Sequence, residues 1–171
     1  MLGEVVRRLA LLAAAPALLA VATPARAGVP VPPLPPALVT TVISPAVLMS
    51  EVVTRTNQQR DRFGCGQLAV DRELTVASVR QSLYMARTGL FSHVWRDGTT
   101  FVARSRAAGY GQPSGENIAW GYRTADEVIA AWMASPSHRA NILNCGAQSI
   151  GTGVAYGTNG VPYYTQVLGY E

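Results

Sequence analysis

The most informative stretch of this chain is Trp132-Met-Ala-Ser-Pro-Ser-His-Arg-Ala-Asn-Ile-Leu143. Its serine at 135 and proline at 136 are typical of a helix start, because serine caps the first turn and proline has no N–H to lose there. We therefore expect a short helix from residue 136 to about residue 143. His138 falls in the first turn of that helix, where the helix dipole disfavours a protonated imidazole, so this histidine is expected to stay neutral.

Four more helices are expected upstream, where apolar residues recur at helical spacing between capping and terminating residues. The first begins at Ser44-Pro45 and ends before Gly64, and the second runs from Asp71 to Gly89. The third and fourth cover residues 99–108 and 125–134. Thr124 caps the fourth helix, which carries an apolar stripe.

The C-terminal part changes to strand-forming sequence. Residues 149–156 and 161–168 are rich in β-branched and aromatic residues, and they flank Gly157-Thr-Asn-Gly160, which is typical of a hairpin turn. Helices followed by an antiparallel hairpin predict an α+β fold rather than a doubly wound parallel sheet.

The N-terminal part predicts export. Residues 1–27 have a charged start, a 14-residue apolar run and a small-residue end, which together are typical of a signal peptide. At 1.5 Å per residue that run spans about 21 Å, too short for a membrane anchor. Residues 28–43 form a proline-rich tether and residues 44–171 the folded domain, so we expect a secreted, extracellular protein without a transmembrane anchor.

The charge of the chain argues against one class of partner. All 14 basic residues are arginines, and they face 10 acidic residues for a net charge of +4. Much of this charge lies in the predicted signal peptide. The rest is too small and too scattered for a surface that follows phosphates, so nucleic acid is not expected as a partner.

The chain has two cysteines, Cys65 and Cys145. In an exported protein two cysteines favour a disulfide over reactive or metal-binding thiols, because neither belongs to a Cys-x-x-Cys pair. The bond would close a loop of 80 residues, for which the chain-entropy estimate is about 4 to 5 kcal/mol.

Two histidines and one glutamate are the candidate site. His93 lies in a predicted loop, His138 opens the last helix, and Glu116 lies between them in Gly115-Glu-Asn-Ile118. Their spacing carries no information on proximity. The alternative is that each histidine is a loop residue that forms hydrogen bonds with its neighbours.

Several motifs, in this order along the chain, resemble the CAP superfamily of cysteine-rich secretory, antigen 5 and pathogenesis-related proteins, in its bacterial secreted branch. They are Phe91-Ser-His93, Gly115-Glu-Asn-Ile-Ala119, Glu127-Val128, the stretch 132–143 and Ile150-Gly-Thr-Gly-Val154. The resemblance covers residues 47–169. It implies an α-β-α sandwich, with helices on both faces of a small, mostly antiparallel sheet.

The resemblance also implies an open cleft that binds a divalent metal in some members. The two cleft histidines of the family fall on His93 and His138, and the glutamate of its Gly-Glu-Asn motif falls on Glu116, next to Asn117. The fourth cleft position, a glutamate in eukaryotic members, is Ser135 here. Glu127 is a reserve carboxylate for the cleft; the alternative is a solvated residue near the amino end of its helix, where a negative charge favours the helix dipole.

Two imidazoles and a carboxylate suit zinc with one open position. His93, His138 and Glu116 are therefore the candidate metal ligands, and as candidate catalytic residues they would serve a metal-assisted, peptidase-like hydrolase. The chain lacks a His-Glu-x-x-His helix and a second acid to serve as general base. A serine nucleophile, Ser135 or Ser137 beside His138, is not favoured, because Ser135 is better explained as a helix cap and Gly111-Gln-Pro-Ser-Gly115 does not fit the Gly-x-Ser-x-Gly pattern.

We therefore favour a monomeric binding module at the cell envelope or outside the cell over an enzyme, and a structural domain whose cleft residues brace the loops is the third interpretation. The resemblance leaves the ligand open between a small molecule, a lipid and a cell-wall component. Most of the aromatic residues are expected in the core, with a groove for an apolar or sugar ligand as the alternative; they are Trp95, Trp120, Trp132, Tyr163 and Tyr164.

Overall fold

Five helices and four strands make up the part of the chain that the computed structural model describes, residues 42–171. The predicted signal peptide and residues 28–41 of the predicted tether lie outside the described residues. The elements in chain order are α1 (Pro45–Arg62), β1 (Ala69–Val70), α2 (Arg72–Thr88), α3 (Phe101–Ala108), β2 (Pro113–Trp120), α4 (Ala125–Ala134), α5 (Pro136–Ile142), β3 (Ser149–Tyr156) and β4 (Pro162–Gly169).

The helix ends follow from capping chemistry. Asp71 accepts a hydrogen bond from the Leu74 amide at 2.8 Å to open α2, and Gly89 closes it in the left-handed region at φ 68°. Ser44 and Thr124 cap α1 and α4 in the same way. Ser135 is an exception: it precedes α5 as predicted, but its side chain makes no capping bond.

The strands form one sheet in the order β1-β3-β4-β2. β3 and β4 are the predicted hairpin, β2 pairs antiparallel with the other side of β4, and the two-residue β1 pairs parallel with β3. The prediction of a small, mostly antiparallel sheet is therefore confirmed. β1 and β2 were not among the predicted elements.

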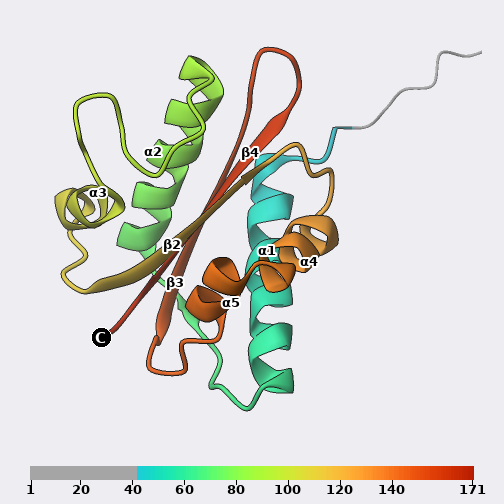
Figure 1. The fold of residues 1–171 in the computed structure, drawn as a ribbon, viewed down its shortest axis with the longest axis vertical. Coiled ribbons are helices and arrows are strands. Elements are labelled where there is room, and N and C mark those ends of the chain that lie inside the picture. Colours follow the sequence, from blue (N-terminus) through green and yellow to red (C-terminus); the bar gives the residue numbers. More distant parts are fainter. Residues whose placement is uncertain (1–41) are drawn as a thin grey trace, which may run out of the picture. The chain divides into compact units, whose positions relative to one another are not determined.

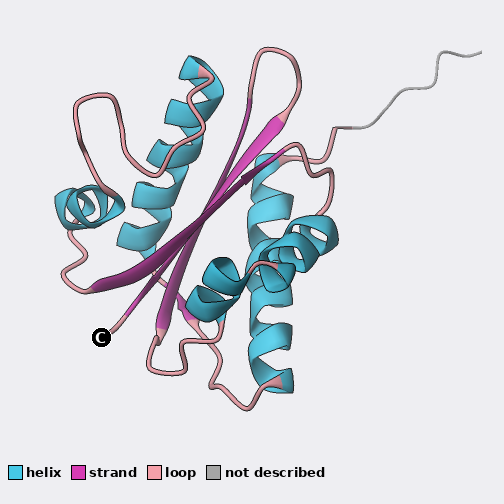
Figure 2. Ribbon diagram, viewed as in Figure 1, coloured by secondary structure: helices cyan, strands magenta, loops and turns pink. Residues whose placement is uncertain are grey.

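Helices cover both faces of the sheet, which confirms the predicted α-β-α sandwich. Figure 1 shows α2 and α3 on one side of the strands and α1, α4 and α5 on the other. The secondary-structure colouring of Figure 2 shows the strands running between these two groups of helices. The larger buried cluster lies on the α1 side and includes Leu48, Val128, Trp132 and Tyr164.

Glycines set how closely α2 approaches the sheet. A Cβ atom added to Gly151 or Gly153 of β3 would collide with the backbone of α2 at Leu74 or Ser78. The missing side chains let the helix lie directly on the strand, where Ser78 Oγ donates to the Gly151 carbonyl oxygen at 3.0 Å. These glycines therefore have a packing role in the strand.

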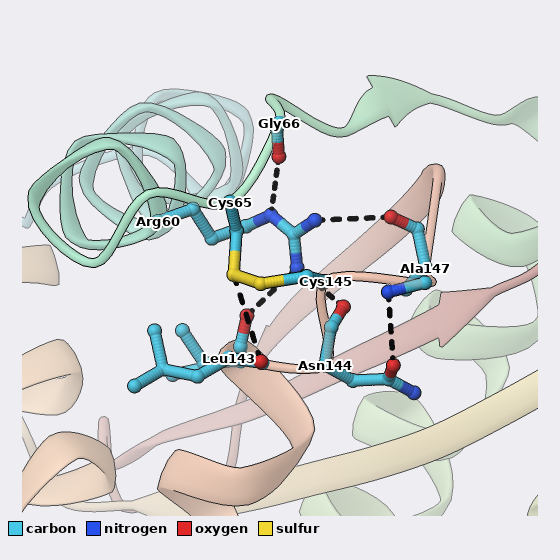
Figure 3. The surroundings of a disulfide bond; sticks show 9 residues. Arg60, Cys65, Gly66, Leu143, Asn144, Cys145 and Ala147 are labelled. Carbon is cyan, nitrogen blue, oxygen red and sulfur yellow. Dashed lines mark hydrogen bonds between the residues drawn. A yellow bond between two sulfur atoms is a disulfide. The ribbon is translucent and has the colours of Figure 1, made fainter.

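A disulfide and a buried arginine join the end of α1 to the loop before β3 (Figure 3). Cys65 and Cys145 are bonded, as predicted. Arg60 is fully buried, and burial lowers the pKa of its guanidinium. Its nitrogens donate to four backbone carbonyl oxygens at 2.7 to 3.0 Å, those of Gly66, Ile142, Asn144 and Ala147.

No helix among the described residues has the length and apolar character needed to cross a membrane. Ile43, which the sequence placed in the tether, packs against the larger cluster, and its carbonyl oxygen accepts from the Tyr156 hydroxyl at 2.7 Å. The contacts of the domain thus begin at the last residues of the predicted tether.

Candidate functional site

His93 and Glu116, which are 23 residues apart in sequence, are in direct contact. His93 lies in the loop between α2 and α3, and Glu116 lies on β2. His93 Nδ1 is 2.9 Å from Glu116 Oε1. The glutamate side chain is only 1% exposed whereas the histidine side chain is 49% exposed, so a buried carboxylate holds an imidazole that faces solvent.

The other carboxylate oxygen of Glu116 is bound by Arg104 of α3. Arg104 Nη2 donates to Glu116 Oε2 at 2.6 Å, and both side chains are almost fully buried. Arg104 Nη1 also donates to the carbonyl oxygens of His93 and Thr99 at 3.1 and 3.0 Å. One buried guanidinium therefore neutralises Glu116 and fixes the backbone of the loop that carries His93.

This arrangement determines which nitrogen of His93 is free. A carboxylate paired with a guanidinium accepts hydrogen bonds, so the proton between His93 and Glu116 belongs on Nδ1 of the histidine. In a neutral imidazole Nε2 then carries the lone pair. His93 can offer Nε2 to a ligand as an acceptor.

The backbone on either side of Glu116 is locked to α5. Asn141 Nδ2 donates to the Glu116 carbonyl oxygen at 3.1 Å and to Asn117 Oδ1 at 2.8 Å. Asn117 Nδ2 in turn donates to the His138 carbonyl oxygen at 3.1 Å. A Cβ atom at Gly115 would collide with the Asn141 side chain, so the close approach of strand and helix needs glycine there.

His138 completes the pair of histidines. Burial lowers the pKa of His138, and electrostatic repulsion by His93, when that ring is protonated, lowers it further. The two imidazoles therefore influence each other electrostatically. Because its pKa lies below the usual value, His138 is neutral at pH 7, as the sequence predicted.

His138 and Ser135 also line a surface groove of about 310 Å³ between the end of β2 and the helices α4 and α5. Phe91, Trp120 and Trp132 form much of its apolar wall. His93, two residues after Phe91 in the neighbouring loop, is exposed to solvent.

Comparison with known proteins gives the family. Residues 53–168 match the sequence profile of the CAP, or cysteine-rich secretory protein, family. This chain belongs to the CAP family. The match covers most of the described CAP domain, including both histidines and Glu116.

A curated relative agrees with this assignment. The chain is 36% identical over 121 residues to the uncharacterised protein YkwD of Bacillus subtilis, a match that covers 70% of this chain. It spans 46% of the length of YkwD, so the relative extends well beyond the CAP domain.

Solved bacterial structures have the same fold. An extracellular protein with an SCP domain from Bacillus anthracis is 26% identical with a TM-score of 0.69, and the match covers 74% of this chain and 41% of that one. An outer surface protein from Borrelia burgdorferi has a TM-score of 0.68 at 20% identity, with coverage of 75% and 96%. The second likeness shows the fold alone.

The remaining candidate residues of the CAP domain have different neighbours. Glu127 forms a capping box with Thr124: its Oε2 accepts from the backbone amides of Arg123 and Thr124 at 2.7 and 3.3 Å. The carboxylate is thus used at the start of α4. Ser135 lies beside His138 in the groove, and its Oγ is 3.4 Å from Ser137 Oγ.

The side chains of the CAP cleft determine which groups are available to bind the expected metal. Within residues 42–171 no group of three His, Cys, Asp or Glu side chains is arranged to hold a metal ion. Both oxygens of Glu116 are engaged by His93 and Arg104. The two imidazoles remain as candidate ligands, with Glu116 in contact with His93 as a carboxylate that can orient the ring, as outer carboxylates do in metal sites.

Arg104 is the functional residue that the sequence analysis missed. A glutamate within an apolar strand needs a cationic partner if the strand is buried, and this rule points to an arginine. The chain offers 14 arginines, however, and nothing in the spacing distinguishes the one in α3. Only the fold brings α3 beside β2.

Proposed function

We propose that this CAP domain acts outside the cytoplasm as a binding module, and that His93 and His138 are the centre of its binding site. The observation that carries the proposal is the buried Arg104–Glu116 ion pair beneath a half-exposed imidazole. A buried ion pair stabilises a fold no better than apolar residues of the same size. Its contact with His93 favours a role in positioning that ring for a ligand.

Binding is favoured over hydrolysis by the way Glu116 is used. A zinc hydrolase generally has three protein ligands and a base that can accept a proton from water. Glu116 already accepts from His93 and Arg104, so it supplies neither function in this arrangement. If a divalent cation binds, His93 and His138 would hold it, and it would supply a Lewis acid for an oxygen-containing ligand.

Export is the second part of the proposal. It is supported by the signal-like pattern of residues 1–27 and by the Cys65–Cys145 disulfide. The similar protein from Bacillus anthracis is described as extracellular. Intact-mass analysis of the protein from culture medium is expected to give a chain that begins at Gly28; a full-length chain in the cytoplasm would contradict export.

Zinc calorimetry tests whether the two histidines form one site. We expect residues 28–171 to bind one Zn²⁺ ion, and we expect His93→Ala and His138→Ala each to abolish that binding while Arg96→Ala, in the same loop as His93, leaves it unchanged. Equal zinc binding by all four proteins would contradict the proposal.

Two further readouts separate the alternatives. Cleavage of casein by the zinc-loaded protein, lost in both histidine variants, would establish a hydrolase in place of a binding module. If the wild type binds no zinc and both histidine variants have a lower melting temperature, the histidines stabilise the loops and do not form a binding site.

A further inference from the structure

The groove beside His138 is lined by two aromatic side chains that are exposed to solvent. Trp120 is 54% exposed and Phe91 is 44% exposed, and both line the groove. Trp132 and Tyr164, by contrast, are each 1% exposed and belong to the core. Two of the aromatic residues near the cleft are therefore kept at the surface.

These rings are held in a fixed arrangement. Trp120 is the last residue of β2, which is an edge strand, and its ring stacks on Tyr163 of β4 with centroids 6.4 Å apart. Phe91, from the loop after α2, lies tilted against Trp120 at 6.5 Å. Three distant segments thus build one aromatic surface next to the two histidines.

Among the described residues, no charged side chain lines the groove. Its polar groups are the side chains of Ser135, Tyr122 and His138. The ion pair Arg104–Glu116 is buried and does not line the groove. A charged ligand would lose hydration here without gaining an opposite charge, so a neutral ligand fits best.

The combination of aromatic and polar side chains in the groove narrows the class of ligand further. A hydrocarbon chain would cover the rings but would displace water from Ser135 and His138 without replacing its hydrogen bonds. A pyranose ring has an apolar C–H face for an aromatic ring and hydroxyl groups at its edge for Ser135 and His138. An open groove with rigid aromatic walls and few polar groups suits such a ligand.

We propose that this groove binds a neutral oligosaccharide, with sugar rings stacked on Trp120 and Phe91 and sugar hydroxyls bonded to Ser135 and His138. The inference rests on the proposed function, because it names the ligand class of the same cleft.

The test is an NMR titration of residues 28–171 with tri-N-acetylchitotriose, a neutral sugar with apolar ring faces. The indole N–H groups of Trp95 and Trp132 already donate hydrogen bonds within the protein, to Gln81 Oε1 and to the Ile118 carbonyl oxygen respectively. We expect the Trp120 indole resonance to shift most, with a dissociation constant on the order of 1 mM.

Three variants make the result specific. Trp120→Ala is expected to weaken binding at least about 10-fold and Trp120→Tyr, which keeps a ring, by less than about 3-fold. Phe63→Ala removes a ring that is equally exposed, at 49%, but lies at the end of α1 outside the groove, and it is expected to leave binding unchanged. Circular dichroism checks that each variant is folded.

Two results would overturn the proposal. The first is no shift at Trp120 up to about 10 mM sugar. The second is tighter binding of decanoate than of the sugar in a manner that depends on Trp120, which would make the groove a lipid site. If either result is found but zinc binding requires both histidines, the oligosaccharide proposal fails and the proposed function stands. If the sugar binds but zinc does not, the oligosaccharide site in the groove stands and the proposed histidine centre fails.

Discussion

At the scale of single residues, the site depends on the pairing of Arg104 with Glu116. Neither group has another opposite charge within salt-bridge distance among the described residues, apart from the contact of Glu116 with His93. Each would be a buried, uncompensated charge without the other. Replacing one of the two residues alone therefore costs more stability than replacing both.

A double-mutant cycle measures this dependence. Arg104→Met is expected to lower the free energy of unfolding by about 3 to 5 kcal/mol because it leaves the Glu116 carboxylate buried and unpaired. Adding Glu116→Gln to Arg104→Met should restore part of that loss, which gives a coupling of about 2 kcal/mol between the two positions. Urea unfolding provides the values.

Arg106→Met is the matched control, since Arg106 is an exposed residue of the same helix. It is expected to change stability by less than about 0.5 kcal/mol. Additive effects of the two buried substitutions would contradict the proposed pairing.

The lowered pKa of His138 predicts a pH dependence of stability. In the folded protein this pKa lies below its usual value of 6.5, so just below pH 6.5 the unfolded chain binds more protons than the folded protein. The contribution of His138 to stability is therefore complete above pH 6.5 and decreases as the pH falls below that value. Urea unfolding of the wild type and of His138→Gln between about pH 7.5 and about pH 5 is expected to show a shallower acid-side loss in the variant. Parallel curves would show that His138 is not the titrating group.

At the scale of elements, the close packing of α2 on β3 is the most restrictive feature of the fold. Gly151 and Gly153 face α2, and a side chain at either position would collide with helix backbone, which cannot rotate away as a side chain can. The serines of α2 confirm the short separation, because Ser82 Oγ donates to the Gly153 carbonyl oxygen at 2.9 Å.

Gly151→Ala is therefore expected to lower the free energy of unfolding by about 3 kcal/mol, because the helix must move to make room. Gly111→Ala serves as the control: Gly111 has a negative φ, and an added Cβ would meet no atom within 4 Å. Thermal unfolding of the two variants tests this, and equal melting temperatures would show that α2 does not lie directly on β3.

The helices and the β3–β4 hairpin are the elements that the sequence could predict. The five helices were predictable because each start or end carries a residue with one local role, such as Asp71 at the start of α2 or Gly89 at its end. The hairpin was predictable from its turn. These signals are local and need no knowledge of the fold.

β2 could not be predicted in this way. Residues 115–117 are glycine, glutamate and asparagine, which are poor strand formers without an alternating pattern. They form a strand because β4 pairs with them and because Asn141 of α5 binds the Glu116 carbonyl oxygen and the Asn117 side chain, all of which are non-local contacts. Arg104 could not be predicted either, because its role also depends on a non-local contact, that of α3 with β2. The two histidines and Glu116 were candidates from the sequence itself, but only the family resemblance placed them in one cleft, since their spacing alone did not predict contact.

At the scale of the whole domain, two devices fasten the end of α1 to the loop before β3. The disulfide Cys65–Cys145 joins residues 80 apart, and the four hydrogen bonds of Arg60 close the same loop without a covalent bond. The domain is therefore expected to fold without the disulfide, at reduced stability.

Replacing both cysteines by serine is expected to lower the free energy of unfolding by about 4 kcal/mol, because the unfolded chain regains the freedom of the open loop. Dithiothreitol should lower the melting temperature of the wild type toward that of the variant and leave the variant itself unchanged. A reductant effect of equal size on both proteins would show that the bond is not the source of the difference.

Nitrogen-detected NMR of the two imidazoles measures most directly whether His93, positioned by Glu116, shares one site with His138. We predict that the neutral form of His93 carries its proton on Nδ1, that His138 is neutral at pH 7, and that both sets of resonances change along a single saturation curve as Zn²⁺ is added. A neutral His93 with its proton on Nε2, or histidines that respond independently to the ion, would contradict a common site positioned by the Arg104–Glu116 pair.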